Sequence, residues 1–386
     1  MALSRSLLRL LGCLTAVSSG LGASAAAGGG PWAVAGTGAA LVADGSRPRW
    51  VIPRRGVSSA AVESRPQPEE WGENLTPYPG FQHQVGISGS RVVWADARDG
   101  FHLQSIVLHD LEAGTQEVIT PRGTNSIIPA IDGDRIVYAR IGAEGPWEFY
   151  SYDIPTGIET LFRRVSRSQG LGRFSVSGHR VVWHERREND GNWDVYLYDM
   201  ETRTVKRLTT DPAEQADPSI EGDLVAWADR RHGGIWWDAY LLDLRTGKER
   251  RLTQATTLAR GPVVSGTAVV WGDLRGGNFS LFVHDVVAES EQRLPTSDME
   301  NALDVSWPWI AWVNRNDDLP AFYDDVLVYN LQTGRETRLT SSPARQWLPA
   351  LAGDFIVWED FRNGDDNADV YFQDLARVAI PGSPRD

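Results

Sequence analysis

Charged side chains that could hold a ligand recur two residues apart along this chain. Each pair joins an acid to an arginine and follows an apolar run that ends in tryptophan. The pairs are Asp96/Arg98, Glu185/Arg187, Asp229/Arg231, Asp273/Arg275 and Asp360/Arg362. They form either a ring of charge that binds a ligand or a structural pair that ties units together or closes a loop. Repetition favours the structural interpretation, because a ligand rarely shares the symmetry of a repeat.

Two units depart from this pattern. Arg140 stands where the other units have an acid, and Asn314 replaces the acid in another unit. Such a departure marks either a ligand site or tolerated drift. We therefore treat Arg140 and Asn314, together with the pair Asp229 and Arg231, as ligand-binding candidates.

Aromatic side chains near the loops are a second possible source of recognition. Their apolar faces and polar edges suit sugar rings or a peptide, although packing beneath the loops is the alternative. The aromatic candidates are Trp147, Trp193, Trp236, Trp237, Tyr323 and Trp347.

Signals for catalysis and metal binding are weak. The seven histidines show no metal-ligand spacing. We expect His83 to face a central channel, and His184 and His232 could approach its mouth. The acidic stretches 188–194 and 363–369 do not fit a calcium loop, and no Gly-x-Ser-x-Gly motif is present. We therefore predict no catalytic residue, no metal site and no cofactor.

The elements that must position these residues repeat at intervals of 41 to 46 residues. Each unit contains four strand-like runs and centres on an apolar pair followed by an aromatic residue. The seven aromatic residues are Trp94, Tyr138, Trp183, Trp227, Trp271, Trp312 and Trp358. A single four-stranded unit cannot bury both faces, so the units must stack around a ring. The sequence thus predicts an all-β fold, a seven-bladed β-propeller of four-stranded antiparallel blades with these aromatics buried between blades.

The fourth unit shows where a site would lie. Its strands are predicted at 218–221, 224–228, 238–243 and 248–252. Short turns join the first strand to the second and the third to the fourth, so these turns share one face of the ring. The longer second-to-third loops and the links between units share the other face. Binding residues usually lie on long loops of a rigid scaffold, so we expect the site there.

The repeat resembles that of TolB-like propellers, which are relatives of WD-type repeats. The matching pattern is Gly-Asp-x-x-x-Trp-x-Asp-x-Arg, then Asp-x-Tyr-x-x-Asp-Leu-x-Thr-Gly, then Arg-Leu-Thr, and it covers nearly all of residues 80–380. The resemblance implies the propeller fold. Such propellers include polysaccharide lyases with a metal held by channel histidines, and periplasmic TolB proteins with six blades and an α/β domain. Seven units without that domain do not support a role in the Tol system.

The beginning of the chain has the features of a secretory signal. Two arginines accompany an apolar stretch, Leu7–Leu21, and Ala23-Ser24-Ala25 fits a cleavage site. A retained membrane anchor and lipid attachment at Cys13 are the alternatives. We predict a signal peptide at 1–25, followed by further segments. These are an irregular linker rich in Ala, Gly and Pro at 26–78, with a possible strand at 48–53, and the propeller at 79–386.

Composition limits the partners. The chain has 386 residues and a net charge of −13, which disfavours nucleic acid and anionic membranes. Its one cysteine, Cys13, lies in the predicted signal, so the mature chain has no disulfide. We expect an exported bacterial protein, periplasmic, secreted or on the cell surface, monomeric and without a transmembrane segment once mature. Its expected function is recognition of a cell-envelope protein or glycan, and the alternative is a propeller-type polysaccharide lyase or hydrolase.

Overall fold

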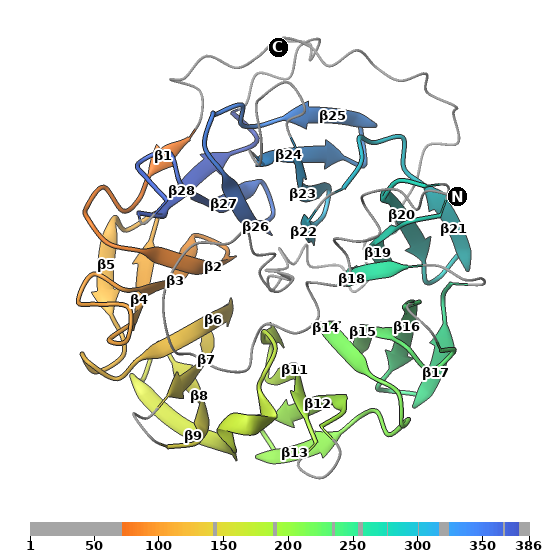
Figure 1. Cartoon of the computed structure of the whole chain (residues 1–386), viewed down its shortest axis with the longest axis horizontal. Helices are drawn as coiled ribbons and strands as arrows, with labels where there is room; N and C mark the ends of the chain where they lie inside the picture. The colour runs from red at the N-terminus through yellow and green to blue at the C-terminus, as the bar shows by residue number, and fades with distance from the viewer. Residues whose placement is uncertain are drawn as a thin grey trace, which may run out of the picture.

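The computed structural model describes residues 72–141, 145–187, 191–233, 236–253, 258–275, 277–299, 301–315, 324–365 and 367–377. These residues form seven four-stranded antiparallel sheets arranged around one axis (Figure 1). The predicted fold, an all-β seven-bladed propeller, is confirmed. One short 3-10 helix, Arg167–Gln169, is the only helix in this part of the chain. The predicted signal peptide and the possible strand at 48–53 lie outside the described residues.

Each of the first six blades uses four consecutive strands, the first innermost and the fourth outermost. Blade 1 comprises β2 (Gln82–Ser88), β3 (Arg91–Asp96), β4 (Ser105–Asp110) and β5 (Thr115–Val118); blade 2 comprises β6 (Ser126–Asp132), β7 (Arg135–Ile141), β8 (Trp147–Asp153) and β9 (Ile158–Val165); blade 3 comprises β10 (Ser175–Ser177), β11 (Arg180–Arg186), β12 (Trp193–Asp199) and β13 (Thr204–Arg207). Blade 4 comprises β14 (Gln215–Glu221), β15 (Leu224–Asp229), β16 (Asp238–Asp243) and β17 (Lys248–Arg251); blade 5 comprises β18 (Ala259–Ser265), β19 (Ala268–Asp273), β20 (Ser280–Asp285) and β21 (Ser290–Arg293); blade 6 comprises β22 (Asn301–Ser306), β23 (Trp309–Arg315), β24 (Asp324–Asn330) and β25 (Arg335–Arg338).

The seventh blade closes the ring with a strand from the other end of the chain. It contains β26 (Gln346–Ala352), β27 (Phe355–Asp360) and β28 (Asp369–Asp374), and its fourth strand is β1 (Glu73–Asn74). Figure 1 shows β1 beside β28. We expected each unit to supply its own four strands, and this was wrong for the seventh. The closing strand lies in the stretch that the sequence assigned to a linker.

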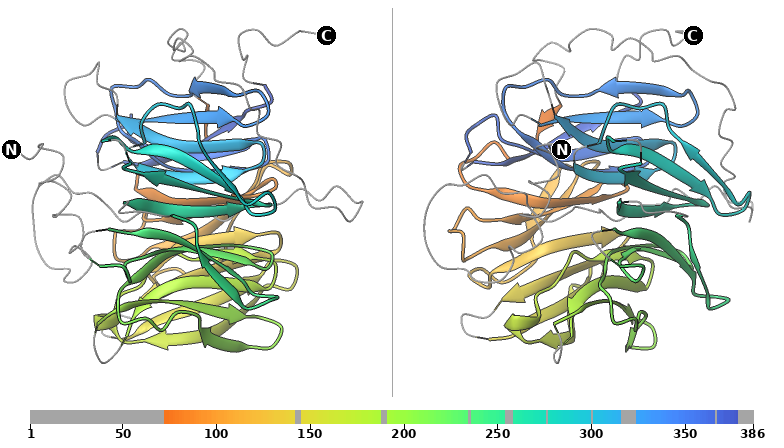
Figure 2. Two further views of the ribbon diagram at one scale, coloured as in Figure 1. Left: turned by 90° about the vertical axis from the view of Figure 1, so that its right-hand side faces the viewer. Right: turned by 45° about the vertical axis from the view of Figure 1, so that its right-hand side comes forward.

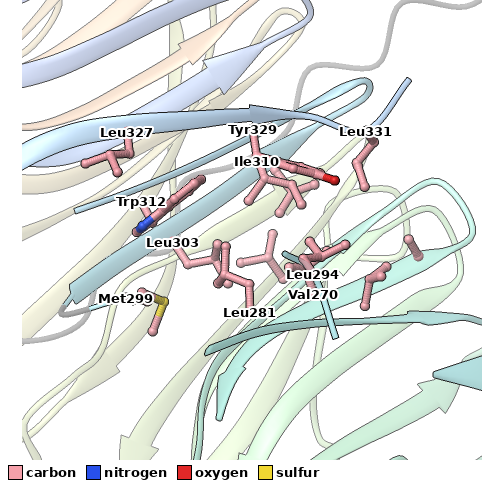
Figure 3. Packing of buried hydrophobic residues seen from close by; sticks show 14 residues of the cluster. Val270, Leu281, Leu294, Met299, Leu303, Ile310, Trp312, Leu327, Tyr329 and Leu331 are labelled. Carbon is pink, nitrogen blue, oxygen red and sulfur yellow. The ribbon is translucent and has the colours of Figure 1, made fainter. Parts of the chain in front are cut away.

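The core of the described residues consists of eight clusters: one lies at each boundary between neighbouring blades, and the boundary between blades 6 and 7 has a second, smaller one. Six of the seven repeated aromatics are fully buried tryptophans and the seventh is Tyr138, as predicted. Each packs against the preceding blade. At the boundary between blades 5 and 6, for example, Trp312 belongs to one cluster with Leu281 and Met299 (Figure 3). Burial between blades explains why a large aromatic side chain recurs at this position of the second strand in every blade.

The strands run across the thickness of the ring, so their ends lie on its two faces (Figure 2). One face carries turns of two to four residues, such as Gly222-Asp223 and Leu244–Gly247. The other, which we call the long-loop face, carries the second-to-third loops and the links between blades. This division agrees with the prediction from strand order. The single short helix of the described residues lacks the length and apolarity needed to cross a membrane.

Candidate functional site on the long-loop face

The innermost strands share an irregularity near the long-loop face. In six described blades the pairing of the first two strands shifts register at a β-bulge. The residue in each bulge has a positive φ, and only one of the six is glycine. These residues are Gln84, Ile128, Asp217, Gly261, Ala302 and Leu348. Positive φ is costly for most of these side chains, and strained backbone of this kind often lies at functional sites.

Polar side chains satisfy the bulge amides across blade boundaries. Gln84 N donates to Glu359 Oε1 of blade 7 at 2.5 Å, and Ile128 N donates to Gln84 Oε1 at 2.6 Å. Asp217 N donates to Nδ1 of His184 in blade 3 at 3.1 Å. Glu359 and His184 occupy corresponding positions on their second strands, where the other blades have alanine, glycine or valine. Blades 3 and 7 therefore break the sevenfold repeat at this position of the second strand.

One arginine connects these groups across the ring axis. Arg173 precedes β10, at the position that corresponds to the bulge residues of the other blades. It acts electrostatically on Asp217 of blade 4, Glu359 of blade 7 and His83 of blade 1. Blades 3 and 7 are not neighbours, so the interaction between Arg173 and Glu359 must cross the ring axis. We call Arg173, Asp217, Glu359, His83 and His184 the axial cluster.

Enclosure by the ring changes the protonation of the axial cluster. Burial raises the pKa of Asp217 to about 7, although Arg173 opposes the shift. Burial also raises the pKa of Glu359 to about 7, against the effects of Arg173 and of the Gln84 amide. Burial lowers the pKa of His83 and of His184 to about 4 in each case. Both histidines are therefore neutral near pH 7, where the two carboxyl groups are partly protonated.

An aromatic run leads outward from the axial cluster over the boundary between blades 7 and 1. Trp347 lies opposite Glu359 in the strand pair and contacts Phe361, with ring centroids 6.4 Å apart. Phe361 contacts Phe81 at 5.8 Å, and Phe81 contacts Phe101 at 6.3 Å. Phe101 is 62% exposed. We call Trp347, Phe361, Phe81 and Phe101 the aromatic run; Phe361 is buried, Trp347 and Phe81 are partly buried, and Phe101 is exposed on the long-loop face.

Trp193 gives the opposite side of the axis a smaller aromatic group. Its ring meets His184 edge-on at 4.9 Å, and the guanidinium of Arg186 lies 4.7 Å from the ring centroid. The His184 ring lies over Gly172, where an added Cβ would come within 2.0 Å of it. Glycine is thus needed at this position. Of the aromatic candidates, Trp193 and Trp347 are the two that the structure places beside the axial cluster.

The repeated acid–arginine pairs lie within blades and close the second-to-third loops. In blade 4, Asp229 accepts hydrogen bonds from Trp227 Nε1 at 2.9 Å, Arg231 N at 2.9 Å and Arg231 Nε at 3.0 Å. Asp229 is fully buried, and Arg231 also pairs with Glu249. Blades 1, 5 and 7 repeat the arrangement. The structure thus gives Asp229 and Arg231 a structural contact rather than a place at the axis.

Blade 3 is an exception. Glu185 accepts hydrogen bonds from Trp183 and from Arg163 of blade 2, whereas Arg187 pairs with Asp194 at 2.8 Å. The expected pairing of Glu185 with Arg187 is therefore wrong, because Arg163 reaches the acid from the neighbouring blade.

The two departures from the pattern have different surroundings. Arg140 pairs with Glu159 at 2.6 Å, and its guanidinium lies 4.2 Å from the Tyr150 ring centroid. The guanidinium of Arg231, in the loop after β15, lies 4.3 Å from the ring centroid of the corresponding Tyr240. Arg140 therefore places a guanidinium over the equivalent ring from within β7. Asn314 lies opposite Asp325 in the β23–β24 pair. Neither departure belongs to the axial cluster.

The remaining aromatic candidates are spread over the face. Trp147 is partly buried between blades 2 and 3, and Trp237 lies beneath Arg230 at 5.4 Å. Trp236 is 37% exposed. Tyr323 lies outside the described residues.

Sequence reasoning missed most of this site. Among the axial residues it singled out only His83 and His184 as near the channel, and of the aromatic run it named only Trp347. Alignment of the units on their tryptophans would have exposed Arg173, Asp217 and Glu359, because each is polar where most other units are not. The bulge that brings these positions together has no clear signature in the sequence.

The site offers carboxylates, arginines and neutral imidazoles in one place. Among the described residues, no group of three or more His, Cys, Asp or Glu side chains is arranged to hold a metal ion. The arrangement can bind a charged group, stack aromatic or sugar faces, and exchange protons near neutral pH.

Comparisons with known proteins support the fold. No family model matches the chain, and a search of curated proteins finds no match. Among solved structures, oligogalacturonate lyase from Vibrio parahaemolyticus matches with a TM-score of 0.61 and 14% identity, over 78% of this chain and 92% of the lyase. The propeller domain of a trilobed protease from Pyrococcus furiosus matches with a TM-score of 0.61 and 11% identity, over 80% and 98% of the two chains. TolB from Acinetobacter baumannii matches with a TM-score of 0.47 and 17% identity, over 64% and 62%. At these identities the likeness concerns the propeller fold alone.

Proposed function

We propose that this propeller is an exported binding protein that recognises a glycan or protein of the cell envelope on its long-loop face. The observation that carries the proposal is the aromatic run beside the axial cluster, where flat apolar faces adjoin charged groups. Phe101 leaves most of its ring exposed at the outer end of the run. Exposed aromatics next to arginines are typical of surfaces that bind sugars or peptides. The similar solved propellers have different activities, so the structural similarity does not favour a glycan over a protein as the ligand.

A matched pair of substitutions tests this proposal. The probes are an array of envelope oligosaccharides and an envelope extract applied to the immobilised protein. We expect Phe101→Ala to reduce capture roughly tenfold or more, because an aromatic side chain that anchors a ligand contributes about 2 kcal/mol. Val287→Ala is the control, since Val287 is 66% exposed on the opposite face. Equal losses in both variants, or none in Phe101→Ala, would place the binding surface elsewhere.

A polysaccharide lyase or hydrolase is the second candidate. Asp217 and Glu359 titrate near neutral pH beside Arg173, and such groups suit general acid–base catalysis. The structural likeness to oligogalacturonate lyases is compatible with this function but concerns the fold. We expect turnover of an acidic oligosaccharide to be lost in Glu359→Gln if this function holds. Absence of product from the native protein, with and without added divalent cations, would remove the candidate.

A further inference from the structure

Arginines on the long-loop face fall into two groups. Those that follow the repeated tryptophans are held by buried carboxylates, at N–O distances of 2.5 to 2.8 Å in blades 1, 4, 5 and 7. Arg173 differs. Within the described residues no hydrogen bond or ion pair engages its guanidinium, and its Nε is buried without a partner.

The carboxylates near Arg173 do not neutralise it by direct contact. Glu359 uses Oε1 for the Gln84 amide, and its charge is suppressed by burial. Asp217 is influenced by Arg260 as well as by Arg173. Burial lowers the pKa of Arg173 itself, which shows that its surroundings disfavour the positive charge. An enclosed guanidinium without a direct counterion is costly, and a bound anion would remove that cost.

A second arginine lies at the edge of the same region. Arg345 stacks on Trp347 at 4.5 Å and on Phe361 at 4.3 Å, and it acts electrostatically on Glu359. No ion pair within the described residues holds its guanidinium. Both arginines therefore lack a direct acid partner among the described residues, although the chain has a net charge of −13. Arg173 and Arg345 create a positive electrostatic potential where the aromatic run meets the ring axis.

We propose that the ring axis on the long-loop face binds a carboxylate group, with Arg173 as the main contact and Arg345 as a second cation at its edge. This inference rests on the proposed function and specifies the chemistry of its ligand. A carboxylate presents two oxygens that match the paired N–H groups of a guanidinium. The group can belong to an acidic sugar or to a peptide, and the two sources share this chemistry.

Small probes test the site without knowledge of the natural ligand. Calorimetric titration would compare D-glucuronate with D-glucose, and N-acetylglycine with N-acetylglycinamide. We expect the charged member of at least one pair to bind more tightly than its neutral counterpart. Arg173→Gln should weaken that binding roughly tenfold or more, because a charge-assisted contact is worth about 1.5–3 kcal/mol. Arg122→Gln removes an exposed arginine of a link on the same face and should change binding less than about twofold.

The neighbouring titratable groups provide an independent readout. Groups facing Arg173 are His83 on β2, Asp217 on β14 and Glu359 on β27, with Arg260 and Arg345 acting on the two carboxyls. As pH rises through about 7 the carboxyls ionise and compete with the ligand, so native affinity should fall. The variant Asp217→Asn/Glu359→Gln should bind more tightly than the native protein at pH 8, whether or not Arg173→Gln folds.

The outcomes separate this inference from the proposed function. Equal binding of charged and neutral probes, or unchanged binding in Arg173→Gln, would overturn the carboxylate site. In that case the Phe101→Ala experiment could still succeed with a neutral ligand. Conversely, Arg173-dependent carboxylate binding would stand even if no envelope ligand were captured.

Discussion

At the scale of single residues, the same types of side chain serve both the repeat and the candidate site. Asp229 and Glu359 are both buried acids, yet Asp229 accepts hydrogen bonds from four donors of its own blade, whereas Glu359 accepts one from the Gln84 amide of blade 1. The first arrangement recurs around the ring and holds loops. The second arises where two blades replace a small residue by a titratable one, and this asymmetry identifies the candidate site.

The structural role of the acid–arginine pairs gives a stability prediction. We expect Asp229→Ala to reduce the free energy of unfolding by about 3 kcal/mol, because it leaves Trp227 Nε1 and Arg231 without their buried acceptor. Arg245→Ala, which removes a largely exposed partner of Asp243, should change it by less than about 0.5 kcal/mol. Urea denaturation measures both values. A similar small effect in the two variants would contradict the proposed structural role.

At the scale of elements, a threonine just after the outermost strand anchors that end of the chain to the third strand in four blades. Thr120, Thr209 and Thr340 accept hydrogen bonds from third-strand amides at 2.9 Å. Thr76 does the same for Val370 N in blade 7, also at 2.9 Å. Asn74-Leu75-Thr76 is therefore the missing copy of the Arg-Leu-Thr motif. That resemblance, visible in the sequence, could have located the closing strand.

Removal of the closing strand should weaken the ring. A chain that begins at Tyr78 lacks β1, the buried Leu75 side chain and the Thr76 hydroxyl. We expect its free energy of unfolding to be about 3 kcal/mol lower than that of a chain beginning at Gly72. Proteolysis should also cut blade 7 earlier than the other blades. Equal stability of the two chains, measured by thermal and urea unfolding, would show that β1 contributes little to closure.

At the scale of the whole molecule, the ring creates an environment that no single blade has. Arg173, Asp217 and Glu359 come from blades 3, 4 and 7, and Arg173 acts on both carboxyls because the closed ring brings these blades together. The raised pKa values of the two acids are therefore consequences of tertiary structure.

This enclosure predicts a dependence of stability on pH. The folded ring holds protons on Asp217 and Glu359 up to about pH 7, whereas an unfolded chain releases them near pH 4. The folded state thus binds more protons between these limits, and the contribution of the two groups to the free energy of unfolding falls as pH rises from about 4 to about 7. Urea denaturation from pH 4 to 8 should show a smaller decline in Asp217→Asn/Glu359→Gln than in the native protein. Identical profiles would show that neither group titrates in this way.

The amino-acid sequence alone determined the architecture, because burial of both faces of a short sheet forces seven copies of Val-Val-Trp-like runs to stack in a ring. The strand Asp238–Asp243 and the buried tryptophans were predicted from that pattern, since strand periodicity and turn residues are local properties. The axial cluster was decided by tertiary structure. Its members lie up to 276 residues apart, between His83 and Glu359, and they meet through bulges and ring closure. Contacts across the axis depend on the three-dimensional path of every blade, which local periodicity does not encode.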